Sequence, residues 1–325
     1  MRGTTRTQQP PRRVRLLYTL KQDPDPRTLS TEQLAALATA QNRLASSPLM
    51  RLVTGFPDRG AVIDWQHLSL PDRELPVRVY RPRRGTDTAL PLVVHLHGGG
   101  FVGTAVQCDW INSLLSARLP AVVVSVEHRL LNRETPLSAA VEDGRDALHH
   151  VARNAEHWGI DPARVAVAGE SCGALVTAMT AINARESEPR LRAQVLVNPA
   201  VDVTSAALDY PSITEYGDSP TLRLETLAAF RELAVPAGTD PRTLSPLHAD
   251  DLSGLPPALV VIPTLDPVAD HGRAYAERLR EAHTPVRVAE HTRSGHAFLS
   301  MPGLDPAARV AGREILEFLD DRLNP

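Results

Sequence analysis

Short apolar runs along the chain predict the strands of one sheet. The runs are Val62–Leu70, Val77–Tyr80, Leu92–His97, Ala121–Val126, Val165–Ala168, Val195–Val197, Leu259–Ile262 and Val286–Ala289. Apolar and polar positions alternate in the first run, which with the second predicts an antiparallel pair at a sheet edge. The run Leu92–His97 is almost continuously apolar, which is typical of a strand covered on both faces in a mostly parallel sheet.

Helical patterns separate most of the later strands. They cover Pro136–Trp158, Ala174–Ala184, Ala269–Ala282 and Pro306–Leu323. This alternation of strands and helices predicts an α/β fold, with a mostly parallel sheet of about eight strands flanked by helices.

Two regions interrupt this alternation. Before the first strand, Ser30 is a candidate N-cap for a helix over Thr31–Ala45, and a short apolar patch runs from Leu49 to Phe56. Between Asn198 and Ala258 there is no strong strand pattern, and a helix is expected only over Leu222–Leu233. Long insertions of this kind are usually lids or binding segments. We therefore expect one helical cap built from two distant parts of the chain.

The expected division of the chain follows from these patterns. Residues 1–60 form an N-terminal tail with cap helices, 61–202 the first part of the α/β core, 203–250 the cap insertion and 251–325 the second part of the core. The first 27 residues are polar and rich in Arg, Thr, Gln and Pro, so we expect most of them to be disordered or loosely attached.

Composition narrows the possible partners and location. The 325 residues are 42% hydrophobic and carry a net charge of -3, which gives no electrostatic argument for a nucleic-acid or membrane partner. Two cysteines form no disulfide framework. Arg12 and Arg13 resemble a twin-arginine signal, but the apolar run after them is too short. We expect a cytoplasmic protein.

The run Gly169-Glu170-Ser171-Cys172-Gly173 predicts a nucleophile elbow. An apolar strand pattern precedes this Gly-x-Ser-x-Gly motif and a helical pattern follows it, which is the context in which such a serine is exposed above an α/β sheet. Glycines two residues to either side allow neighbouring backbone to approach closely. By itself the motif also occurs in ordinary turns, so its context carries the interpretation.

A glycine run and two further side chains complete the candidate site. His97-Gly98-Gly99-Gly100-Phe101 follows a predicted strand and offers unshielded backbone N–H groups for an oxyanion hole. A flexible turn or phosphate cradle is the alternative, but the run lacks the Lys-Ser/Thr end of a P-loop. In chain order the acid and then the base should follow the serine. Asp266 and His296 each follow a strand, with Asp270 and His291 as competitors.

These four motifs together resemble those of hormone-sensitive-lipase-like esterases, in the α/β-hydrolase superfamily. The resemblance implies Ser171 as nucleophile, Asp266 as orienting acid and His296 as base. It implies an oxyanion hole from the backbone N–H groups of Gly99, Gly100 and Cys172, and a two-part cap. Glu170 and Cys172 depart from the family's usual Gly-Asp-Ser-Ala-Gly, and Glu127–Arg133 departs from its usual Asp-Tyr-Arg-Leu-Ala-Pro-Glu.

The predicted function is a serine carboxylesterase that hydrolyses small or short-chain esters through an acyl-enzyme on Ser171. Acyl transfer, lactone opening and a lyase-type step on a natural product use the same site and stay open. A non-catalytic binder, similar to the plant gibberellin receptors, is a third hypothesis; those receptors lack the catalytic histidine. We expect no cofactor and no metal, although His95 and His97 would face one way on their strand. The exposed last strand, Val286–Glu290, suggests a possible homodimer.

Overall fold

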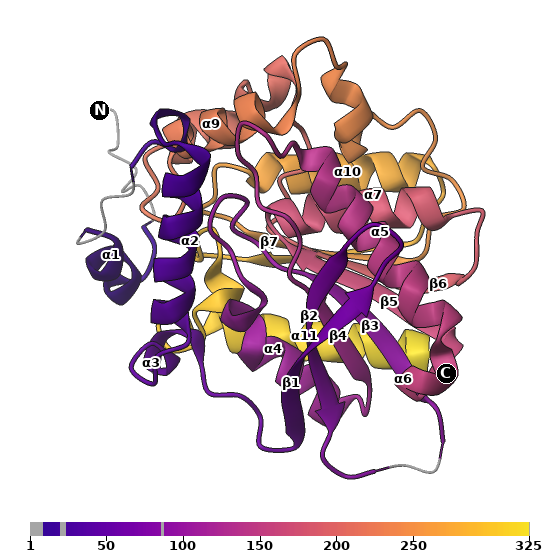
Figure 1. Cartoon of the computed structure of the whole chain (residues 1–325). Coiled ribbons are helices and arrows are strands. Elements are labelled where there is room, and N and C mark those ends of the chain that lie inside the picture. Colours follow the sequence, from indigo (N-terminus) through magenta and orange to yellow (C-terminus); the bar gives the residue numbers. More distant parts are fainter. Residues whose placement is uncertain (1–8, 20–23, 86–87, 325) are drawn as a thin grey trace.

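One sheet runs through the protein, whose computed structural model describes residues 9–19, 24–85 and 88–324. Its strands are β1 (Ala61–Ser69), β2 (Glu74–Pro82), β3 (Leu90–Leu96), β4 (Val122–Val126), β5 (Ile160–Glu170), β6 (Leu191–Val197), β7 (Ala258–Pro263) and β8 (Val286–His291). They lie in the order β1-β2-β4-β3-β5-β6-β7-β8 (Figure 1). Pairing is antiparallel from β1 to β2 and from β2 to β4, and parallel across the rest. The predicted sheet, with its antiparallel pair at one edge, is confirmed.

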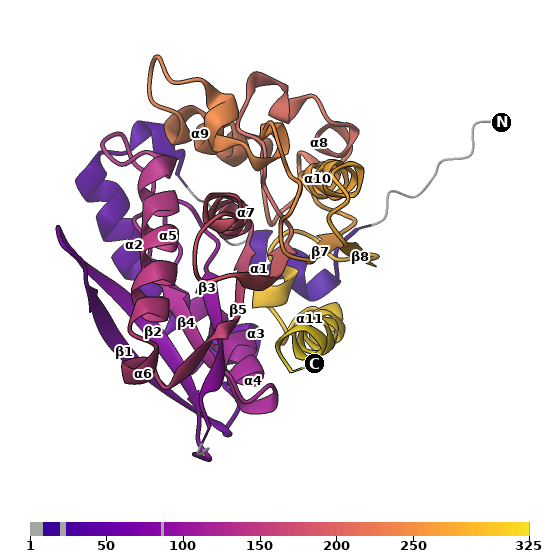
Figure 2. The ribbon, with the colours of Figure 1, turned by 90° about the vertical axis from the view of Figure 1, so that its right-hand side faces the viewer.

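Helices cover both faces of this sheet. They are α1 (Arg12–Thr19), α2 (Thr31–Ala45), α3 (Arg51–Thr54), α4 (Asp109–Arg118), α5 (Leu137–Arg153), α6 (Ala155–Trp158), α7 (Cys172–Ala184), α8 (Pro211–Tyr216), α9 (Leu224–Ala234), α10 (Ala269–Glu281) and α11 (Ala307–Leu323). Figure 2 shows α5, α7 and α10 on one face, and α4 and α11 on the other. None of the helices in the described part of the chain is long and apolar enough to cross a membrane.

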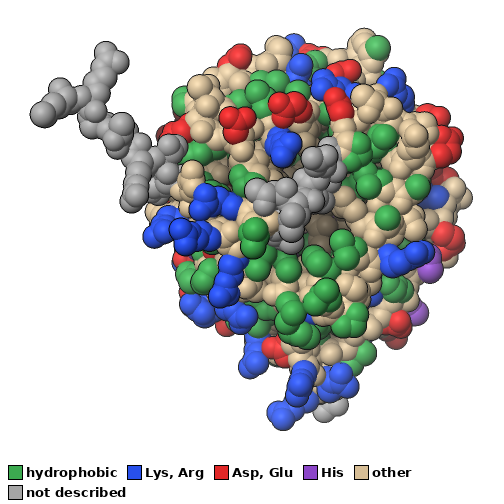
Figure 3. All heavy atoms as spheres, turned by 90° about the vertical axis from the view of Figure 1, so that its left-hand side faces the viewer, with side chains coloured by type: hydrophobic (Ala, Val, Ile, Leu, Met, Phe, Trp, Pro, Cys, Tyr) green, Lys and Arg blue, Asp and Glu red, His purple; other side chains and the backbone are tan. Residues whose placement is uncertain are grey.

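The N-terminal region is more ordered than its composition predicts. Residues 12–19 form α1, with Val14 buried, so the expected disorder is wrong for this segment, whereas residues 1–8 and 20–23 lie outside the described residues. Helix α2 has its predicted bounds. Ser30 accepts a hydrogen bond from the Gln33 amide, and the Gln33 side chain accepts one from the Ser30 amide. Figure 3 faces this side of the molecule.

The insertion between β6 and β7 reaches this N-terminal region. It holds α8, α9 and the 3-10 helices η3 (Ser205–Leu208), η4 (Pro241–Leu244) and η5 (Pro246–His248). Arg27, in the 3-10 helix η1 (Pro26–Thr28), pairs with Glu232 of α9 at 3.5 Å. Two parts of the chain about 200 residues apart thus meet above the sheet, as a two-part cap requires. The division into cap and core stays a prediction.

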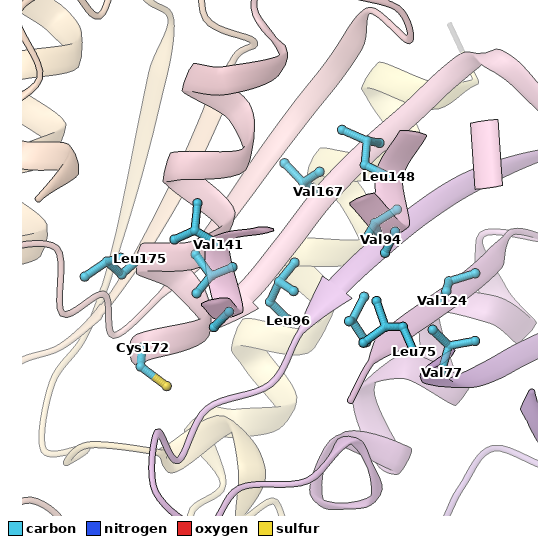
Figure 4. Packing of buried hydrophobic residues seen from close by; sticks show 14 of the residues in the cluster. Leu75, Val77, Val94, Leu96, Val124, Val141, Leu148, Val167, Cys172 and Leu175 are labelled. Atoms are coloured by element: carbon cyan, nitrogen blue, oxygen red, sulfur yellow. The ribbon is translucent and has the colours of Figure 1, made fainter. Parts of the chain in front are cut away.

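Side chains of the central strands alternate between two cores. Val94 and Leu96 of β3 belong to the core beneath α5 and α7 (Figure 4), whereas Val93 belongs to the core beneath α4 and α11. Both faces of β3 are therefore covered and shielded from water, which explains its continuous apolar run.

Two helical predictions were incomplete. The helix predicted over Pro136–Trp158 is broken at Asn154 into α5 and α6. Helix α4 was not predicted. Its apolar residues Ile111 and Leu115 belong to the core, but the polar residues Asp109, Asn112, Ser113 and Ser116 are fully buried as well. The contrast between an apolar and a polar face that predicts an amphipathic helix is therefore weak.

Candidate active site

Ser171 lies at a sharp turn between β5 and α7. Its backbone dihedrals are φ 54° and ψ -120°, a conformation that a residue with a side chain rarely adopts. Strain of this kind persists only where the surroundings impose it, and it is common at functional sites. The Ser171 amide donates to Val197 O of β6 at 2.9 Å, which ties the turn to the sheet.

The two glycines of the motif are required by space. A Cβ atom on Gly169 would lie 2.4 Å from Gly173 O and from Thr177 Oγ1. A Cβ on Gly173 would lie 2.3 Å from Leu96 O of β3. Real Cβ atoms essentially never approach backbone this closely, so only glycine fits at either position.

Two loops bring His296 and Asp266 to this turn. His296 follows β8 and Asp266 follows β7, and both side chains are buried. His296 Nε2 lies 2.8 Å from Ser171 Oγ, and His296 Nδ1 lies 2.8 Å from Asp266 Oδ2. The other Asp266 carboxylate oxygen accepts from the Val268 amide at 3.0 Å, which fixes the carboxylate. The hydroxyl, the imidazole and the carboxylate thus form one hydrogen-bonded chain.

The two competing residues are engaged elsewhere. Asp270 accepts a hydrogen bond from the Ser212 amide and pairs with Arg273 on α10. His291, at the end of β8, lies 3.0 Å from the Glu314 carboxylate of α11. These partners hold both side chains elsewhere, whereas Asp266 and His296 are in line with the Ser171 hydroxyl.

The glycine run forms a tight loop beside Ser171. Gly99 has φ +81°, and a Cβ on Gly103 would lie 1.9 Å from Gly98 O. The amides of Gly99, Gly100 and Cys172 donate no hydrogen bond to any described residue, and all three residues line the pocket that holds Ser171. Free backbone donors next to a serine hydroxyl suit the stabilisation of an oxyanion.

The segment that departs from the family pattern supports this loop. His128 Nε2 lies 3.1 Å from His97 O, and the two imidazole rings are stacked at 4.1 Å. The Leu131 amide donates to Gly100 O at 2.7 Å. Glu127 accepts from the Ala105 amide at 2.8 Å, just beyond the glycines. The unusual residues therefore still hold the glycine loop in place.

A buried ion cluster anchors that supporting segment. Arg129 pairs with Asp143 of α5 at 3.0 Å, and Arg73 pairs with the same carboxylate at 2.9 Å. Asp143 is fully buried, whereas its chain neighbour Glu142 is exposed. Removing one partner of a buried ion pair leaves an uncompensated charge, so the cluster fixes Arg129 and the segment around it.

Glu170 connects the serine turn to the loop that carries His296. Its carboxylate accepts a hydrogen bond from Ser300 Oγ at 2.9 Å, and Cys108 Sγ lies at 3.6 Å. Burial raises the pKa of Glu170 above its usual value. Ser300 lies four residues after His296, and no pattern in the sequence marks it as Glu170's partner.

One group of possible metal ligands lies under this turn. Within the described residues, His95, Cys108 and Glu170 present ligand atoms that lie within 4.8 Å of one another; His97, the partner considered from sequence, is outside the group. His95 Nδ1 bonds Ser125 Oγ at 2.9 Å, and burial raises the pKa of the Cys108 thiol. Metals bind the thiolate, so a thiol held protonated fits a metal poorly.

The site opens into an apolar cavity of about 530 Å³. One wall is the glycine loop with Ser171, Cys172 and His296; the other comes from α2, α3 and α9 with the segment before α9. Cap residues in this second wall are Leu44, Met50, Val53, Leu222, Thr226 and Phe230. Burial raises the pKa of Cys172 to about 12, so its thiol acts as an apolar group in the cavity wall.

Comparison with known proteins places the chain among esterases. The Abhydrolase_3 family model, described as α/β hydrolase fold, matches residues 93–300. Carboxylesterase NlhH of Mycobacterium tuberculosis is 39% identical over 247 residues, which make up 73% of this chain and 75% of NlhH. An arylesterase of Saccharolobus solfataricus is 35% identical over 247 residues, which are 72% of this chain and 76% of the arylesterase. A solved ester-hydrolase from the metagenome of Lake Arreo, complexed with a bipyridine phosphonate derivative, superposes with a TM-score of 0.83 at 29% identity, over 97% of this chain and 99% of that one.

Proposed function

The chain belongs to the Abhydrolase_3 family, the hormone-sensitive-lipase-like esterases of the α/β-hydrolase fold, and is a serine carboxylic ester hydrolase; on this premise we propose that Ser171, His296 and Asp266 are its catalytic triad. The observation that carries the proposal is the position of His296, with one ring nitrogen 2.8 Å from Ser171 Oγ and the other 2.8 Å from Asp266 Oδ2. A base in this position can take the hydroxyl proton while the carboxylate holds its tautomer.

The reaction proceeds in two halves. Ser171 Oγ attacks the ester carbonyl carbon while His296 Nε2 accepts the hydroxyl proton, and Asp266 stabilises the resulting imidazolium. His296 then gives the proton to the departing alcohol, which leaves an acyl group on Ser171. A water molecule attacks this acyl-enzyme, with His296 again as base, and the carboxylic acid departs from the regenerated serine.

The oxyanion of each tetrahedral intermediate is bound by backbone amides. We assign this role to the N–H groups of Gly99, Gly100 and Cys172, which donate to no described residue. Because these donors are already fixed by the tight loop and the start of α7, no reorganisation is needed as charge develops. A single donor of this kind contributes roughly 3 kcal/mol to the stabilisation of the transition state in serine hydrolases.

The cavity suits small or short-chain esters with apolar groups. A volume of about 530 Å³ is modest, and most of its lining side chains are apolar. We propose that residues 1–60 and 203–250 form a cap that closes this cavity over a core of residues 61–202 and 251–325. No ionisable side chain of the cap lines the cavity within the described residues, so a charged acyl or alcohol group would find no partner there.

Phosphonate labelling tests the nucleophile directly. A fluorophosphonate reacts with an activated serine, and the Lake Arreo ester-hydrolase was solved with a phosphonate. We expect the wild type to be labelled once, at Ser171, and Ser171→Ala to be unlabelled. Ser187→Ala, beyond the far end of α7, is the matched control and should label normally. Hydrolysis of p-nitrophenyl acetate by Ser171→Ala should fall by about 10⁵-fold or more in kcat; wild-type activity in that variant would overturn the assignment.

The esterase relatives favour none of the alternative reactions, and His296 is present, unlike in a binder that has lost its base.

Two further expectations complete the proposal. A cytoplasmic location stays a prediction, in line with the two free cysteines. A homodimer through β8 also stays a prediction; β8 is an edge strand of the sheet, and light scattering of the purified protein would test it.

A further inference from the structure

An exposed apolar surface lies on the outer side of the N-terminal helices. We define the apolar cap face as Leu44 at the end of α2, Leu49, Leu52 of α3, and Phe56. These four side chains are between 56% and 73% exposed, and with Leu16 of α1 they are the five most exposed large hydrophobic side chains among the described residues. In Figure 3 hydrophobic side chains gather on this side of the molecule. A surface of this kind marks a site of interaction.

The apolar cap face does not serve the packing of α3. This helix is held from its inner side, where Gly55 lies against Trp110 and Pro302 and where Val53 O accepts from the Gly303 amide at 3.0 Å. Leu49, Leu52 and Phe56 remain exposed to water. Their apolar character therefore needs a reason other than folding.

The segments that carry the apolar cap face, together with α1, are basic, although Arg51 is paired with the buried Asp109 at 2.6 Å and Asp58 follows Phe56 closely. Residues 9–19 and 41–56 contain five arginines and no acidic residue, in a chain whose net charge is -3. Arg12, Arg13 and Arg43 are exposed and have no ion-pair partner among the described residues. The net charge of the chain thus conceals a cationic rim around an apolar surface.

We propose that the apolar cap face binds the surface of an anionic lipid bilayer. Helices that lie on membranes combine an exposed apolar side with basic residues that meet anionic headgroups. The face is also continuous with the catalytic cavity, because Leu44 belongs to both. A bound bilayer would lie at the entrance to Ser171, so an amphiphilic ester could pass from the lipid to the serine along apolar side chains.

A second copy of the chain is a poorer occupant. In a two-fold dimer through this face, each rim would meet its own equivalent. Both copies would then bring Arg12, Arg13 and Arg43 to one interface, and like charges across an interface disfavour association.

Vesicle flotation tests the proposal. The probe is a set of vesicles of equal parts phosphatidylcholine and phosphatidylglycerol, compared with pure phosphatidylcholine, and we expect the full chain to float with the anionic vesicles only. Leu49→Ser/Leu52→Ser/Phe56→Ser removes apolar contact, and Arg12→Glu/Arg13→Glu reverses charge; each should weaken binding about tenfold or more. Val310→Ser, at a 41% exposed valine on α11, is the control and should bind as the wild type does.

Activity separates this proposal from the catalytic one. None of the substituted residues lines the cavity, so every variant should hydrolyse p-nitrophenyl acetate at the wild-type rate, and Ser171→Ala should still float. The proposal would be overturned if the wild type did not float with anionic vesicles. It would also be overturned if both multiple variants floated as well as the wild type does. A dimer in light scattering that Leu49→Ser/Leu52→Ser/Phe56→Ser dissociates, without vesicle binding, would show that a second copy covers this face.

Discussion

The two walls of the catalytic cavity are built in opposite ways. The core wall, made by the glycine loop and the serine turn, is so closely packed that a single added Cβ would lie 1.9 Å from backbone at Gly103 and 2.3 Å at Gly173. The cap wall is made of flexible or aromatic side chains such as Met50 and Phe230, on helices that join across the exposed Arg27–Glu232 pair. On the proposed function the core wall fixes the reacting groups, and we expect the cap wall to set which ester reaches them.

The two walls should differ in how well they tolerate amino-acid substitutions, for a physical reason. Closely packed backbone cannot relax around an added atom, whereas long side chains on a cap helix can repack. A change in the core wall should thus reduce activity on every substrate. A change in the cap wall should alter the ranking of substrates and leave the chemistry intact.

The strongest test of the core wall is Asp266→Asn. An amide at this position cannot stabilise the imidazolium and favours the wrong tautomer of His296, so kcat should fall by about 10⁴-fold with little change in KM. Steady-state kinetics on p-nitrophenyl acetate measure this. Asp270→Asn is the matched control, because that carboxylate pairs with Arg273 outside the site, and its kcat should stay near wild type. Equal losses in both variants would show that Asp266 has no special role.

Gly173→Ala should damage the core wall without touching a reacting group. The new Cβ would collide with Leu96 O, and both the strand and the helix are fixed, so we expect the free energy of unfolding to fall by about 3 kcal/mol or more. Urea denaturation measures the loss. Gly85→Ala is the control, because a Cβ there meets nothing within 4 Å. A Gly173→Ala protein as stable as the control would show that the packing is looser than described.

Strand β3, which leads into the core wall, carries a buried histidine that should make stability depend on pH. Burial lowers the pKa of His95 from 6.5 to about 3, so below pH 6.5 the unfolded chain binds a proton that the folded chain does not. His95 therefore favours the folded state fully above its unfolded pKa, and this stability is lost as the pH falls toward 3. Between pH 7 and pH 5 the wild type should lose about 2 kcal/mol more than His95→Gln in urea denaturation. His67→Gln, at an exposed histidine, should follow the wild type; parallel curves for all three proteins would contradict the prediction.

The sequence predicts the core wall far better than its supports. Strands such as β3 have strong apolar patterns, and the order of serine, acid and histidine narrows the site to Asp266 or Asp270 and to His291 or His296. The supports act at long range: His128 reaches His97 31 residues away, and Ser300 reaches Glu170 130 residues away. A pattern of apolar and polar positions carries no signal for such pairs, and none for the burial of a charged residue such as Asp143.

The cap is predicted least well, for a different reason. The apolar residues from Leu49 to Phe56 indicate a buried patch, yet Leu49 and Phe56 are exposed. Apolar character predicts contact with something other than water, but it does not say whether that contact is internal. The sequence thus indicates the existence of the cap helices and leaves open which of their sides faces the core.

Phe230 of α9 lies in the cap wall against the glycine loop. Its ring lies 3.0 Å from the position that a Cβ on Gly100 would take, and it meets the ring of Phe101 edge-on at 6.3 Å. It therefore limits the cavity just beside the proposed oxyanion donors. Phe230→Ala should lengthen the cavity, so kcat/KM for p-nitrophenyl hexanoate relative to acetate should rise about tenfold, since one or two accommodated methylenes are worth this much.

The pattern of the change distinguishes a specificity role from a structural one. Phe230→Leu should give a smaller shift in the same direction, and Leu224→Ala, on the same helix but outside the cavity, should give none. An equal loss of kcat on both esters in Phe230→Ala would mean that the ring supports the glycine loop and belongs functionally to the core wall. A rise in kcat/KM for the hexanoate ester alone, with kcat on the acetate ester preserved, would show that Phe230 selects the substrate. The contact between Phe230 and Gly100 would then separate the residues that select the ester from those that react with it.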